Sequence, residues 1–75
     1  MYEINVIYDN LNKANIIGLK AALASIESVR SITIDKSQST ITLLSKRKKI
    51  REDLLINAGK LNNCSFRTII NTRKA

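Results

Sequence analysis

The 75-residue sequence contains no histidine, proline or tryptophan, and its only cysteine is Cys64. A single cysteine excludes a disulfide framework within the chain. Without histidine, the side chain used most often as a general base and as a metal ligand is missing. No apolar run approaches the roughly 18 residues that a transmembrane helix requires. Residues 1–4 also lack the basic and apolar regions of a signal peptide. We therefore expect a cytoplasmic protein.

Aromatic residues and glycine are scarce as well. The sequence has only three aromatic residues and two glycines, so the core must come from Ile, Leu, Val and Ala. A chain of this length forms one domain, and no repeat or low-complexity linker divides it. We expect residues 1–75 to be a single domain of modest stability. A domain this small buries only about 60% of the surface that its unfolded chain exposes.

Four stretches alternate between apolar and polar residues with the period of a half-buried strand. They are residues 2–8, 29–35, 40–44 and 64–71, the last of which is strand-like around Phe66 and Ile70. The polar run 36–39 between the second and third stretches predicts a tight hairpin turn. Residues 72–75 are predicted to form a flexible tail.

Two other stretches repeat apolar residues every three or four positions, as an amphipathic helix does. Residues 13–28 carry Ile16, Leu19, Leu23 and Ile26 at this spacing, and residues 48 to about 61 carry Ile50, Leu54, Ala58 and Leu61. Gly59 is a candidate for the end of the second helix. The element order predicts a ferredoxin-like βαββαβ sandwich of the α+β class, with a four-stranded antiparallel sheet and both helices on one face.

The first helix and the strand after it resemble those of a known family. The apolar positions Ile16, Leu19, Leu23, Ile26, Val29, Ile32 and Ile34 are similar to those of the heavy-metal-associated (HMA) domains of copper chaperones and metal-pumping ATPases. The short turn and V-x-V strand of that family correspond here to Glu27-Ser28-Val29 and Ile32-Thr33-Ile34. The resemblance extends over almost the whole chain and implies a metal-binding loop between the first strand and the first helix.

The M-x-C-x-x-C motif that defines this family is absent. Alignment on the helix places Asn12 and Asn15 at the cysteine positions and Asn10 at the methionine position. Alignment on the first strand shifts these positions by about one residue and also finds no Cys, His or Met. Cu(I) requires soft sulfur ligands, which asparagine does not offer. We expect no bound metal or other cofactor and a core role for Cys64, and a site shared by two copies of Cys64 stays open.

The sequence shows no arrangement typical of an enzyme. Glu52-Asp53 is its only pair of adjacent acidic residues, and neighbours on a helix point to different sides. Acylphosphatases share the predicted fold, but the Gly-rich phosphate-binding loop expected for them is missing. We therefore predict a non-catalytic protein.

Positive charge is in excess, because 13 Lys and Arg oppose 6 Asp and Glu for a formal net charge of +7. Cations at the start of the second predicted helix are unfavourable for the helix dipole, so stability alone does not explain them. We expect the first and third strands to be parallel neighbours, which would bring the loops that follow them to one edge together with two helix N-termini. The candidate anion-binding residues of this edge are Lys13, Lys46, Arg47, Lys48, Lys49 and Arg51.

The leading hypothesis is an HMA-like binding module with a degenerate metal site, which docks an acidic protein partner through this basic edge. One alternative is nonspecific nucleic-acid binding by the same edge. Such binding would be dominated by the phosphate backbone, because the predicted open sheet face lacks the aromatic residues on which RNA-recognition modules stack bases. A second alternative is an accessory role in copper trafficking. The open sheet face, with Ile7, Leu44 and Ile69, leaves a homodimer open.

Overall fold

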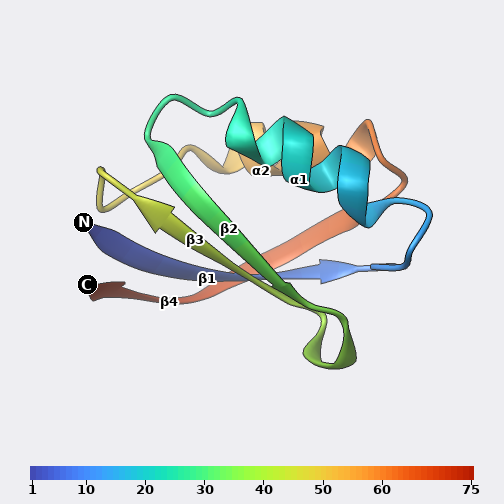
Figure 1. Ribbon diagram of the computed structural model, residues 1–75, viewed down its shortest axis with the longest axis horizontal. Helices are drawn as coiled ribbons and strands as arrows, with labels where there is room; N and C mark the ends of the chain where they lie inside the picture. The colour runs from blue at the N-terminus through green and yellow to red at the C-terminus, as the bar shows by residue number, and fades with distance from the viewer.

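Two helices cover the same face of a four-stranded sheet in the computed structural model, which describes residues 1–75 (Figure 1). The elements are β1 (Tyr2–Asp9), α1 (Ile16–Ala24), β2 (Val29–Asp35), a 3-10 turn (Lys36–Gln38), β3 (Thr40–Ser45), α2 (Glu52–Lys60) and β4 (Ser65–Lys74). The strand order is β2-β3-β1-β4, and all neighbouring strands are antiparallel. This arrangement confirms the predicted ferredoxin-like α+β fold. Each helix is nine residues long, too short to cross a bilayer.

The prediction that β1 and β3 run parallel is wrong. Tyr2 pairs with Ser45 and Ile7 pairs with Thr40, so β1 begins where β3 ends. The crossover through α1 makes β1 and β2 parallel, and the tight hairpin then reverses the chain into β3. The loop after β1 and the loop after β3 therefore lie at opposite ends of the molecule, as Figure 1 shows.

The core lies between the sheet and the helices. Its fully buried side chains are Ile4, Val6 and Tyr8 from β1, Ile41 and Leu43 from β3, Leu19 and Leu23 from α1, and Leu55 from α2. Tyr8 packs edge-on against Phe66, with ring centroids 5.7 Å apart, and donates its hydroxyl to the Leu55 carbonyl at 2.6 Å. Burial raises the pKa of Tyr8. The alternation predicted for the two central strands is thus confirmed.

Helix α2 buries only part of the stripe that its apolar spacing predicts, because Ala58 is buried as expected and Leu54 and Leu61 are not. Leu54 is 37% exposed and Leu61 is 80% exposed, whereas Leu55 is fully buried. The predicted stripe begins at Ile50, which is buried but precedes the helix. Gly59 does not end α2, because Leu61 is the C-cap residue and Gly59 is buried within the helix.

Strand β4 continues to Lys74, so the prediction of a flexible tail at residues 72–75 is wrong. Lys74 pairs with Tyr2, and the N–H of Ala75 donates to the Met1 carbonyl at 3.0 Å. Two register shifts relative to β1 change which β4 side chains face the helices. As a result Ile69 packs against the core, although the sequence placed it on the open face, and Ile70 is half exposed.

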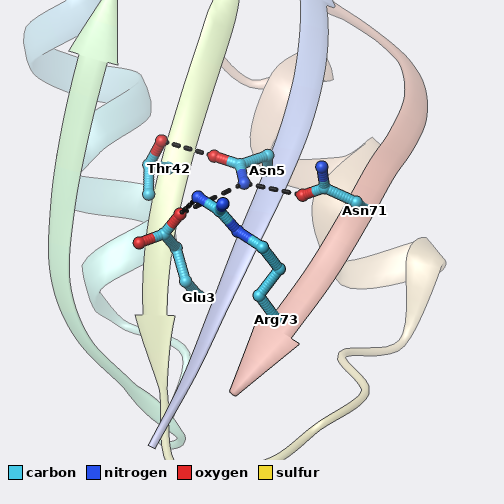
Figure 2. A network of polar contacts seen from close by, with 5 residues as sticks. All are labelled: Glu3, Asn5, Thr42, Asn71 and Arg73. Atoms are coloured by element: carbon cyan, nitrogen blue, oxygen red, sulfur yellow. Dashed lines mark hydrogen bonds and ion pairs between the residues drawn. The ribbon is translucent and has the colours of Figure 1, made fainter. Parts of the chain in front are cut away.

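The sheet face opposite the helices carries a polar network across three strands (Figure 2). Asn5 on central strand β1 accepts from Thr42 Oγ1 at 2.6 Å and donates to Asn71 Oδ1 at 2.7 Å. Arg73 donates to Glu3 at 2.6 Å. Hydrogen bonds from Arg73 and Asn5 hold the pKa of Glu3 below its usual range. Cross-strand pairs of this kind stabilise the sheet, and a homodimer through this face stays a prediction.

Candidate basic interface

The loop between β3 and α2 presents five of the six predicted anion-binding residues. Lys46, Arg47, Lys48, Lys49 and Arg51 are all exposed. They follow one another on a connection that belongs to neither the sheet nor the helix. We call the run of four consecutive cations, residues 46–49, the basic loop.

Both ends of the basic loop are anchored to the body of the protein. The N–H of Lys46 donates to the Ser28 carbonyl at 2.8 Å. The buried Ser45 hydroxyl accepts from the Arg47 N–H at 3.0 Å and donates to the Arg47 carbonyl at 2.8 Å. At the other end the Ile50 side chain is only 7% exposed. The backbone is therefore held in place, and the cations between the anchors point into solvent.

The cations of the basic loop have no acidic partner. The three ion pairs of the structure are Arg51–Asp53, Arg67–Asp9 and Arg73–Glu3, and none of them includes residues 46–49. Arg51 is held at 2.6 Å by Asp53, which lies with Glu52 in the first turn of α2. These carboxylates already offset the positive end of the helix. The unpaired charge therefore belongs to the basic loop and not to the N-terminus of α2.

Cations from β2 and β4 lie at the same end of the sheet as the basic loop, and the sequence prediction did not include them. Strand β2 begins here and β4 ends here, because Val29 pairs with Ser45 and Tyr2 pairs with both Ser45 and Lys74. The cationic residues gathered at this end, which we call the basic end, are Arg30, Lys46, Arg47, Lys48, Lys49, Arg51, Arg73 and Lys74. The chain termini also meet at this end (Figure 1). Only the correct strand directions could have revealed the contribution of β2 and β4.

Lys13 does not belong to the basic end. It lies between β1 and α1, at the opposite end of the sheet (Figure 1). The prediction that residues 10–15 and 46–51 share one edge is therefore wrong. The two helix N-termini are also at opposite ends, because each follows one of two antiparallel strands.

A groove beside the basic loop lies between the segment that follows α1 and the start of α2. It has a volume of about 240 Å³ and is lined by Ile26, Glu27, Ser28, Arg47, Lys49, Ile50, Arg51 and Leu54. Three of these residues are apolar, and Arg47 and Lys49 belong to the basic loop. This groove is a feature of tertiary packing that the sequence pattern does not predict.

Asn12 and Asn15, at the positions of the missing cysteines, close the turn that leads into α1. Asn12 Oδ1 accepts from the N–H groups of Ala14 at 2.9 Å and Asn15 at 3.1 Å. In return, Asn15 Oδ1 accepts from the Asn12 N–H at 2.9 Å, so the two side chains close the turn before the helix reciprocally. Asn15 is 7% exposed and also donates Nδ2 to the Asn10 carbonyl at 2.5 Å. The amide oxygens of both residues are therefore engaged by the loop backbone, and α1 begins at Ile16 instead of residue 13.

Replacing Asn15 by alanine is expected to lower the free energy of unfolding by about 1–2 kcal/mol, because a buried side chain with two hydrogen bonds is lost. Urea unfolding followed by circular dichroism measures the change. Asn57→Ala is the matched control, since Asn57 is exposed on α2. The control is expected to change stability by less than about 0.5 kcal/mol. Equal losses in the two variants would contradict a structural role for Asn15.

Cys64 lies in the core, as expected for a small apolar residue. It is 4% exposed, its Sγ is 3.5 Å from the Asn62 carbonyl oxygen, and burial raises the pKa of its thiol. No group of three or more Cys, Asp or Glu side chains lies close enough together to hold a metal ion. Asn12 and Asn15 therefore hold the loop backbone before α1, and Cys64 packs in the core.

No family model matches this sequence, and a search of curated proteins finds no significant match. The resemblance to HMA domains accordingly depends on the apolar positions and the element order of the chain itself.

Proposed function

We propose that this protein is a non-catalytic, HMA-like binding module that docks an acidic protein partner through its basic end. One observation carries the proposal: the four consecutive cations of the basic loop are exposed and unpaired on a backbone fixed at both ends. Unpaired surface cations attract carboxylates and steer their approach. Because the backbone is already ordered, binding costs less conformational entropy than it would on a free tail.

The remaining chemistry of the chain supports binding over catalysis. The Cys64 thiol and the Tyr8 hydroxyl both lie in the core. Tyr8 already donates to the Leu55 carbonyl. In the loop where HMA domains hold metal, Asn12 and Asn15 bind backbone groups instead. We therefore propose a degenerate metal site and a cytoplasmic docking role without a cofactor.

Charge reversal of the basic loop tests the proposal. The double variant Lys46→Glu, Lys48→Glu is expected to weaken binding of a fluorescein-labelled, Asp- and Glu-rich twelve-residue peptide by about tenfold or more, because attraction becomes repulsion. Fluorescence anisotropy at about 50 and 200 mM salt measures the affinity, which should fall with salt. Circular dichroism verifies that the fold is retained.

The matched control is Lys13→Glu, Lys36→Glu, which changes the net charge equally at the opposite end of the sheet. It is expected to weaken binding far less than the basic-loop variant. Equal weakening by both variants would show attraction to overall charge and would contradict the proposal. Tighter binding of a single-stranded oligonucleotide than of the acidic peptide would favour the nucleic-acid alternative and overturn an acidic protein partner.

A further inference from the structure

Three apolar residues line part of the groove beside the basic loop, and we call them its floor. Ile50 is 7% exposed, Ile26 is half-buried, and Leu54 is 37% exposed although it is a large aliphatic side chain. These three residues come from the segment after α1, the end of the β3–α2 loop and the first turns of α2. The apolar surface that the protein leaves uncovered therefore comes mainly from Leu54 and in part from Ile26.

The rim of the groove is mainly cationic. Arg47 and Lys49 are unpaired, and Arg51 is paired with Asp53. Glu27 is the only acid among the lining residues, and it forms no ion pair. A partner that carries only negative charges would be repelled by this carboxylate and would leave Leu54 uncovered. Charge alone therefore does not complement the groove. An apolar side chain with carboxylates beside it complements both floor and rim.

We propose that the basic end recognises a short acidic protein segment that inserts one apolar side chain into this groove. The apolar side chain contacts Ile26, Ile50 and Leu54, and carboxylates on either side of it contact Arg47 and Lys49. The inference rests on the proposed function and specifies its partner as an acidic segment with an apolar anchor. Covering the exposed floor adds specificity that screened surface charge does not supply.

Two eleven-residue acidic peptides that differ only at the central position, leucine or asparagine, test this inference. The protein is expected to bind the leucine peptide about tenfold more tightly, because the anchor buries apolar surface. Leu54→Gln should remove this preference, so that the two peptides bind with equal affinity. The matched control is Leu61→Gln, which replaces an 80% exposed leucine at the far end of α2 and should keep the preference.

The outcomes separate the inference from the proposed function. Equal affinity for both peptides, with loss of binding in the Lys46→Glu, Lys48→Glu variant, would overturn the apolar anchor and leave acidic docking in place. Failure of both peptides to bind at low salt would overturn both proposals. A preference removed equally by Leu54→Gln and Leu61→Gln would place the anchor outside the groove and overturn the inference.

Discussion

Replacement of Leu55 by alanine is expected to lower the free energy of unfolding by about 2–5 kcal/mol. The Leu55 side chain on α2 is fully buried against the sheet, and its carbonyl accepts a hydrogen bond from the Tyr8 hydroxyl. Truncation removes buried apolar surface and leaves a cavity that the surrounding structure closes only in part. A domain of this size has a total stability on the order of 4–11 kcal/mol. The expected loss is therefore a large share of the whole.

Leu54→Ala is the matched control for this prediction, because the two leucines are adjacent in one helix and differ in burial. Leu54 is 37% exposed, so its truncation is expected to cost less than about 1 kcal/mol. Urea unfolding at 25 °C, followed by circular dichroism, measures both variants. A cost for Leu54→Ala as large as that for Leu55→Ala would contradict the observed face of α2 and support the stripe predicted from spacing.

The strand pattern could be predicted because alternation depends only on local sequence. Ile4 and Val6 of β1, and Ile41 and Leu43 of β3, point to the helices as their period of two requires. The face of α2 could be predicted only in part, because Ala58 is buried as expected and Leu54 is exposed. Counting in steps of three or four assumes that the first residue lies in the helix, and Ile50 lies outside it.

Local sequence also could not predict which β4 side chains face the helices. A register shift adds one residue to a strand, and every later side chain then changes face. For this reason Ile69, expected on the open face, packs against the core, and its neighbour Ile70 is half exposed. Nothing in the local sequence marks the shift, because it depends on how β4 pairs with β1. The prediction of a loose tail failed similarly, since pairing with β1 orders Thr72 to Lys74.

The residues of the candidate site could likewise be predicted only in part from the sequence. The cations at 46–49 and 51 could be found from sequence because they are consecutive, and the structure keeps them together. Lys13 would join this site only if β1 and β3 were parallel, and their antiparallel pairing places it at the opposite end. Asn12-Lys13-Ala14-Asn15 did carry a usable local signal. Two capping side chains three residues apart before an apolar run are typical of a helix start.

Gly59→Ala is expected to lower the free energy of unfolding by about 1–3 kcal/mol, although alanine is the better helix former. A Cβ at position 59 would lie 2.6 Å from the Cys64 carbonyl oxygen and 2.9 Å from Tyr8 Cε2. Neither neighbour can move freely. The Cys64 N–H donates to the Gly59 carbonyl at 2.9 Å, and the Tyr8 ring is fixed in the core. The added methyl group must therefore distort packed backbone or core.

Gly18→Ala provides the control, because Gly18 is also helical and has no positive φ. A Cβ at position 18 would overlap only the Asn62 side-chain amide. That amide can rotate away at the cost of its hydrogen bond to the Ala58 carbonyl, and the gain in helix propensity of about 1 kcal/mol offsets this loss. Urea unfolding of the two variants should therefore separate them by at least about 1 kcal/mol. A Gly59→Ala variant as stable as Gly18→Ala would contradict the close approach of α2 to Cys64, since only a rigid backbone neighbour makes the methyl group costly.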